Sequence, residues 1–193
     1  MTGIVISESE PLPVVFVTVG TTYHTFDRLM GWLEGWLRDR PGQVRMVIQH
    51  GPSRRPDGAE GFAMCGQQEL LELMRRADVV VTQGGPGGIM DSRSCGILPL
   101  VVPRIPELNE VVDDHQVRFC THLAQAGMVR LATDEATLRA ELDAAIADPA
   151  ALRIEVDSGH VEAAVQRTGE LIDELVARRP PRHRRRAERR SGR

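Results

Sequence analysis

Residues 77–91 have the sequence ADVVVTQGGPGGIMD, and this stretch decides the fold. The apolar run at its start predicts a buried strand, which ends at Gln83. Four glycines within the next five positions, interrupted only by Pro86, predict a tight turn, and a helical pattern follows from Ile89. Backbone N–H groups and the positive end of a helix dipole would then face one crevice. Such a crevice suits the pyrophosphate of a nucleotide.

Strand-like and helix-like segments alternate along most of the chain. Runs of β-branched residues predict buried strands, and apolar residues at helical spacing predict helices between them. Because the links are short, right-handed βαβ units are favoured, and the sequence predicts an α/β fold with a Rossmann-like, mostly parallel sheet and helices on both faces. The expected strands are residues 14–19, 44–49, 62–65, 78–82, 98–102 and 128–131, and the expected helices are residues 26–37, 67–76, 88–95, 113–126, 135–147 (capped by Asp134) and 161–177.

The length of 193 residues and the hydrophobic share of 41% predict one core with terminal extensions. We expect a disordered leader at residues 1–12, an α/β domain at residues 13–177 and a basic, disordered tail at residues 178–193. No apolar run reaches the length of about 18 residues that a spanning helix needs, and the chain does not begin like a signal peptide. The widely spaced cysteines fit no zinc pattern or disulfide framework, so a cytoplasmic location is expected.

The tail from Arg178 to Arg193 differs in charge from the rest of the chain. It holds nine arginines and one glutamate, while the whole chain has a formal net charge of −3. Three interpretations are open: a solvated extension, attraction to an anionic membrane surface at about 1 kcal/mol per basic residue, or binding of nucleic acid. The tail lacks the aromatic side chains that nucleic-acid binding usually adds, so no nucleic-acid partner is expected.

Three loops rich in glycine and polar residues follow predicted strands, at residues 20–22, 83–88 and 103–115. The carboxyl ends of parallel strands meet at one edge of a sheet, where open α/β folds bind their ligands. In the first loop, the small side chains allow close approach of a diphosphate, and the hydroxyls of Thr21 and Thr22 can donate to it. The alternative is an ordinary turn in which a threonine caps the next helix.

The glycines of the second loop match neither the GxGxxG fingerprint nor a P-loop. They favour close approach of a nucleotide. The alternatives are a flexible loop or close packing of the helix on its strand. Asp91 lies one helical turn later, where its carboxylate can accept hydrogen bonds from the two hydroxyls of a ribose. The alternative for Asp91 is a favourable interaction with the helix dipole.

The third loop leads into the sequence DDHQ at residues 113–116. Asp113 or Asp114 is expected to cap a helix whose first turn directs His115 and Gln116 toward the crevice. Alternatively, His115 is a structural or solvated residue. The chain has no HExxH motif and no matched set of His and Cys residues, so no metal is expected.

Three segments of the chain together resemble the glycosyltransferase family 28 C-terminal-domain proteins. These are VFVTVGTTYHTFDRL at residues 15–29, residues 77–103, and DDHQVRFCTHLAQAG at residues 113–127. The resemblance covers residues 13–147. By pattern, the chain is similar to the catalytic, donor-binding subunits of two-part bacterial exopolysaccharide glycosyltransferases and of the dolichol-linked N-acetylglucosaminyltransferase.

The resemblance implies the C-terminal half of a GT-B glycosyltransferase, which binds a UDP-sugar donor and needs no metal or other cofactor. It implies a hexosyltransferase in polysaccharide biosynthesis, acting on a lipid-linked or polysaccharide acceptor held by a membrane-anchored partner subunit. The chain would then be cytoplasmic and peripheral at the inner face of the cell membrane, with the basic tail near anionic lipid. A non-catalytic nucleotide-sugar-binding or scaffolding protein is the alternative.

The resemblance also assigns roles to individual residues. Asp91 stands where relatives often have a glutamate on the ribose, Gln83 where they often have histidine, and Pro86 stiffens a loop that is usually Ala and Gly. His115 and Gln116 match a His-Gln pair near the donor sugar and phosphates and are the implied catalytic residues. The implied nucleotide-binding residues are Gly20, Thr21, Thr22, Gln83, Gly84, Gly85, Gly87, Gly88 and Asp91.

Overall fold

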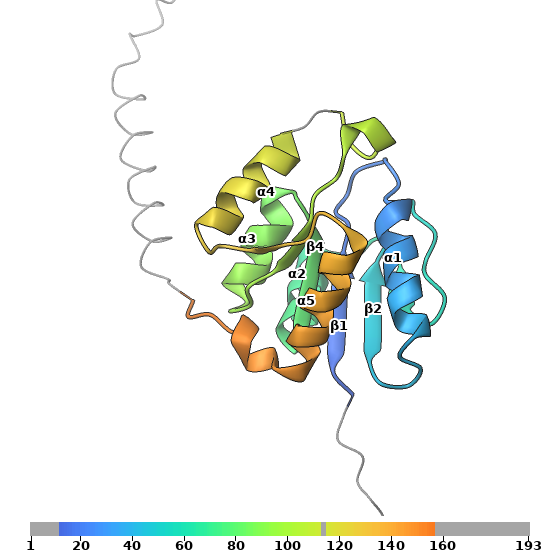
Figure 1. Ribbon diagram of the computed structural model, residues 1–193, viewed down its shortest axis with the longest axis vertical. Helices are drawn as coiled ribbons and strands as arrows, with labels where there is room; N and C mark the ends of the chain where they lie inside the picture. The colour runs from blue at the N-terminus through green and yellow to red at the C-terminus, as the bar shows by residue number, and fades with distance from the viewer. Residues whose placement is uncertain (1–11, 113–114, 157–193) are drawn as a thin grey trace, which may run out of the picture. The chain divides into compact units, whose positions relative to one another are not determined.

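The computed structural model describes residues 12–112 and 115–156, which form an α/β domain (Figure 1). The predicted leader, the basic tail, the expected helix at residues 161–177 and the two candidate caps Asp113 and Asp114 lie outside these residues. Among the described helices, none is long and apolar enough to cross a membrane.

The six strands of the described residues form one sheet in the order β3-β2-β1-β4-β5-β6. All of their pairings are parallel, as the sequence predicts. The strand order reverses direction between β1 and β4, which creates a switch point where a crevice opens beyond the carboxyl ends of these strands. The strands are β1 (Val14–Thr18), β2 (Arg45–Gln49), β3 (Glu60–Phe62), β4 (Val79–Gln83), β5 (Leu100–Val102) and β6 (Arg130–Leu131).

Helices cover both faces of the sheet, which confirms the predicted layers. Alternate residues of β1 point to opposite faces, so Val15 and Val17 pack in one cluster and Phe16 in another. The first cluster is covered by α1 (Asp27–Arg38) and α5 (Glu135–Ala147), and α5 crosses in front of the sheet in Figure 1. The opposite face carries α2 (Gln67–Arg76), α3 (Pro86–Ser94) and α4 (His115–Gln125).

Several predicted boundaries differ from the structure by one to three residues, and two of these differences have identifiable reasons. β3 lies earlier than the expected residues 62–65 because its backbone pairs with β2 from Glu60, which stands opposite Val47. The next residue, Gly61, brings its backbone so close to β2 that a Cβ would lie 2.7 Å from the carbonyl oxygen of Ile48. α3 begins at Pro86 rather than Gly88, because proline is favourable at the first helical position, where its missing N–H costs nothing.

The cap predicted for the fifth helix is confirmed. The Asp134 carboxylate accepts a hydrogen bond from the backbone N–H of Thr137 at 2.8 Å. The Thr137 hydroxyl donates a second hydrogen bond to the same carboxylate. Together the two bonds hold the pKa of Asp134 below its ordinary value.

Candidate functional site

The carboxyl ends of β1 and β4 meet at the switch point, as the sequence predicts. Gly20 lies two residues after the end of β1 and has a φ of 76°, which favours glycine. A Cβ at Gly20 would lie 2.9 Å from Nε2 of Gln83, and a Cβ at Gly85 would overlap the same side-chain amide. Gln83 therefore lies between the two glycines, and the structure brings the first two predicted loops together.

The threonines of the first loop do not cap the following helix. α1 begins at Asp27, with Phe26 at its N-cap and no side-chain cap. Thr21 is exposed and Thr22 is half-buried. The expected alternative of a threonine cap is therefore wrong, and the Thr22 hydroxyl instead accepts a hydrogen bond from the backbone N–H of His24 within the loop.

Close packing, one of the interpretations that the sequence left open, explains some of the glycines after β4 but not all. Gly84 and Gly88 allow close packing, since a Cβ would lie 2.7 Å from Sγ of Cys120 and 2.5 Å from Oγ1 of Thr82, respectively. Gly87 is exposed, and a Cβ there would meet nothing within 4 Å. Close packing therefore does not explain Gly87.

The N-terminus of α3 is open toward solvent. No side chain caps it, and Pro86 stands at its first turn. The N–H groups of this turn and the helix dipole favour an anion. Asp91 follows Gly87 and Gly88 by one turn on the same helix and is half-buried, so it borders the same site.

α4 brings the third predicted motif to the glycine turn. His115 is exposed at the start of the helix, while the side chain of Gln116 lies against Gly84 and accepts a hydrogen bond from the backbone N–H of Arg104 at 3.2 Å. An open hollow of about 600 Å3 is lined by Gly84, Pro86, His115, Gln116, Arg118 and Phe119. Of the predicted site residues, the hollow is therefore lined by Gly84, His115 and Gln116. The others do not line it: Gly20, Thr21, Thr22, Gln83, Gly85, Gly87, Gly88 and Asp91.

Sequence reasoning missed a buried charged cluster beneath these loops. The Arg104 side chain is 1% exposed, and its guanidinium lies 4.6 Å from the ring centre of Phe26. Burial lowers the pKa of Arg104 to about 10, while the neighbouring Glu110 raises it. Glu110 in turn binds Arg28 at 2.9 Å. Charged residues in a loop are usually exposed, so the only signal in the sequence was the position of Arg104 directly after an apolar strand.

Unsatisfied polar atoms concentrate at the same edge. Among the described residues, three buried side-chain atoms lack a hydrogen-bond partner: His24 Nε2, Gln83 Oε1 and Arg104 Nε. Most buried polar atoms in proteins are paired, so three at one edge need an explanation. A ligand or ordered water at the crevice would supply the missing partners.

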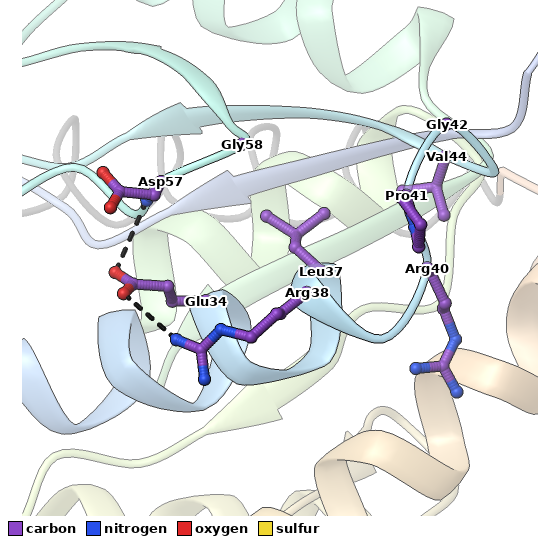
Figure 2. A pocket seen from close by; sticks show the side chains of 9 residues that line it. All are labelled: Glu34, Leu37, Arg38, Arg40, Pro41, Gly42, Val44, Asp57 and Gly58. Atoms are coloured by element: carbon purple, nitrogen blue, oxygen red, sulfur yellow. Dashed lines mark hydrogen bonds and ion pairs between the residues drawn. The ribbon is translucent and has the colours of Figure 1, made fainter.

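A second hollow, of about 340 Å3, lies near the C-terminal end of α1 (Figure 2). Glu34 there binds Arg54 and the backbone N–H of Asp57, so the carboxylate already has partners. The hollow contains none of the predicted site residues. Elsewhere too, no group of three or more His, Cys, Asp or Glu residues within the described ranges could hold a metal ion.

Comparison with known proteins identifies the domain. A model of the glycosyltransferase family 28 C-terminal domain matches residues 14–166. The chain belongs to this family. The resemblance and fold class expected from the sequence are therefore confirmed, and the described residues have the α/β architecture of the C-terminal domain of GT-B glycosyltransferases.

Individual relatives agree with this assignment. The chain is 26% identical over 97 residues to NDP-glycosyltransferase YjiC of Bacillus licheniformis, a match that covers 49% of this chain and 24% of the relative. The glycotransferase of kitacinnamycin has a TM-score of 0.54 at 21% identity, covering 77% of this chain and 40% of that structure. MurG of Acinetobacter baumannii has a TM-score of 0.53 at 16% identity, and the match covers 75% of this chain and 44% of that structure. The chain thus spans less than half the length of these glycosyltransferases, and the structural likeness concerns the fold.

Proposed function

We propose that this glycosyltransferase domain binds a UDP-sugar at the switch-point crevice and transfers its hexosyl group with the help of a membrane-anchored acceptor-binding partner. The acceptor is a lipid-linked sugar or a polysaccharide. The observation that carries the proposal is the open N-terminus of α3, with Gly87 facing free space beside the carboxyl ends of β1 and β4. This arrangement favours a diphosphate, because the N–H groups of the first helical turn and the helix dipole both attract an anion.

In this proposal, different predicted residues contact different parts of the donor. Gly20, Thr21 and Thr22 contact the diphosphate, and Asp91 accepts hydrogen bonds from the ribose hydroxyls. The turn at Gly84, Gly85, Gly87 and Gly88 lines the nucleotide, and His115 and Gln116 contact the donor sugar and its phosphates.

In the proposed reaction, an acceptor oxygen bonds to the anomeric carbon of the sugar while the bond from that carbon to the diphosphate breaks. The proton of the acceptor hydroxyl passes to a base on the partner, and UDP leaves with the electron pair. Donors fixed around the departing diphosphate stabilise its developing charge without a metal. This domain therefore supplies the leaving-group side of the reaction.

Exposed apolar side chains support a partner at the same edge. Tyr23 and Val112 are each 80% exposed, and Leu108 and Phe119 are also exposed near the crevice. Apolar side chains grouped at one edge are typical of an interaction site. We therefore place the partner across the crevice, with the complex on the cytoplasmic face of the membrane and the basic tail near anionic lipid.

Calorimetric titration of the purified chain with UDP tests the proposal, with ADP and NAD as controls. We expect UDP to bind and Asp91→Ala to weaken it by about tenfold, since the ribose loses a charged hydrogen-bond partner. Asp57→Ala, a carboxylate of the second hollow, is the matched control and should bind like wild type. Absence of UDP binding, both alone and with the partner present, would contradict the proposal. Binding without sugar transfer by the assembled complex would instead support the scaffolding alternative.

A further inference from the structure

We propose that Arg104 is a positioning residue of the donor site, whose buried guanidinium holds two loops in the arrangement that binds the diphosphate. The inference rests on the proposed function. Arg104 lies just after β5, and its side chain reaches across the switch point to the loop that follows β1. It need not touch the donor, because its hydrogen bonds end on the backbone of the loops.

The first loop held by Arg104 comprises residues 19–26, between β1 and α1. Its Nη2 donates to the carbonyl oxygen of Val19 at 3.0 Å, and its Nη1 donates to those of His24 and Thr25 at 3.2 and 2.9 Å. The guanidinium also stacks on the ring of Phe26. One side chain thus fixes both ends of the loop that carries Gly20, Thr21 and Thr22.

The second loop comprises residues 103–112, between β5 and α4. Nη1 of Arg104 also donates to the carbonyl oxygen of Glu110 at 3.0 Å, and the backbone N–H of Arg104 donates to Gln116. The Glu110 carboxylate accepts from Arg28 and from the backbone N–H of Ile105, which closes the network. Arg104 therefore connects the diphosphate loop with the residue that contacts the donor sugar in the proposed site.

The hydrogen bonds from Arg104 to the loop carbonyl groups fix the orientation of the loop's peptide planes. In a trans peptide the C=O and the N–H point in opposite directions. With the carbonyl oxygens of Val19, His24 and Thr25 directed at the guanidinium, these oxygens are kept away from an anionic ligand. Loss of Arg104 would free them to turn toward the crevice and repel a diphosphate.

The network also has an excess of positive charge. Arg28 binds the carboxylate of Glu110 directly, while Arg104 bonds to the backbone carbonyl of Glu110, so two guanidinium groups lie near a single carboxylate. Arg104 and Glu110 are buried, where charges are poorly screened by water. The field of this cluster therefore favours an anion at the crevice above it.

Titration of Arg104→Met and Arg104→Lys with UDP and with uridine tests the inference. We expect both variants to bind UDP about tenfold more weakly, since neither side chain can bond to both loops, with little change for uridine. A merely structural role would weaken both ligands by the same factor. All titrations are made well below the thermal unfolding midpoint of each variant, and Arg104→Lys keeps a buried cation if the Met variant does not fold.

Arg40→Met is the matched control. Arg40 also stacks on an aromatic ring, at 4.7 Å from Trp36, and also bonds to a backbone carbonyl, but far from the crevice along α1. We expect this variant to lower the unfolding midpoint while UDP binding stays within about twofold of wild type. Unchanged UDP affinity in both Arg104 variants, or equal losses for UDP and uridine, would overturn the inference. If wild type binds neither ligand, the proposed function fails instead.

Discussion

The two ends of α1 each carry an aromatic ring with an arginine over it, yet the two arginines have different surroundings. Arg104 lies 4.6 Å from the centre of Phe26, and Arg40 lies 4.7 Å from that of Trp36. Arg104 is buried and bonds to the backbone of two loops. The side chain of Arg40 is 19% exposed and pairs with Asp143 of α5. The same stacked pair thus holds loops at one end and joins two helices at the other.

The two ends of α1 also differ in how completely their buried polar atoms are hydrogen-bonded. The three unpaired buried side-chain atoms of the described residues all belong to the Phe26 end. At the other end, Asp143 accepts from both the indole N–H of Trp36 and the guanidinium of Arg40. Hydrogen bonding therefore distinguishes the two ends: the polar atoms around Trp36 are paired within the fold, while unpaired ones remain near Phe26.

The largest expected effect comes from neutralising the carboxylate at each end. Glu110→Gln removes the counter-charge of the half-buried Arg28 and of the nearby buried Arg104, so we expect a loss of about 3 kcal/mol in the free energy of unfolding. Asp143→Asn keeps an acceptor for Trp36 and removes only a partly exposed ion pair, for which we expect a loss below about 1 kcal/mol. Urea unfolding of both variants measures the difference. Equal losses would contradict the contrast between the two ends.

The sequence predicted the elements whose signals are local. The β-branched run of β1 and the helical spacing of α2 placed these elements correctly, and Asp134 was correctly predicted as a cap. Long-range contacts were not predictable in this way. The position of β3 depends on its backbone pairing with β2, in which Glu60 stands opposite Val47, and no local pattern reveals this pairing.

In the candidate site, too, the local features could be predicted and the long-range contacts could not. Its three loops were predicted, since each follows a strand of a parallel sheet. The sequence could not show that Gly84 and Gly88 are packed while Gly87 is open, because that depends on Cys120 and Thr82 from other positions of the fold. It also gave no reason to bury Arg104, whose partners come from residues up to 85 positions away.

Gly87→Ala is expected to have the next largest effect, and Gly31→Ala is its control. Both positions are in helices, and a Cβ at either would meet nothing within 4 Å. Alanine should therefore stabilise each helix by about 0.5–1 kcal/mol. Only Gly87→Ala should weaken UDP binding, by about tenfold, because its methyl group would occupy the space of the diphosphate.

Calorimetry and thermal unfolding of the two glycine variants provide the measurements. Unchanged UDP affinity in Gly87→Ala would show that this part of the turn does not meet the ligand. A lowered unfolding midpoint would instead show that the free space at Gly87 was wrongly assigned.

The smallest expected effect concerns the thiol behind the glycine turn. Cys120 is buried against Gly84, and burial raises the pKa of its thiol to about 11. Because the thiolate is the reactive form and appears only as the pH rises toward that value, alkylation by iodoacetamide at pH 9 should be slow. Mass spectrometry should find faster modification of the partly exposed Cys95. Equal rates for the two thiols would mean that the turn opens readily.

The most direct test of the account is a UDP titration of the 15N-labelled chain followed by amide NMR. It compares the switch-point crevice with the hollow near the C-terminal end of α1 (Figure 2). The account predicts shifts at the amides of Gly20, Thr21 and Gly87, with those of Gly42 and Gly58 unchanged. Shifts confined to Gly42 and Gly58, or no shift at the crevice with the partner present, would contradict it.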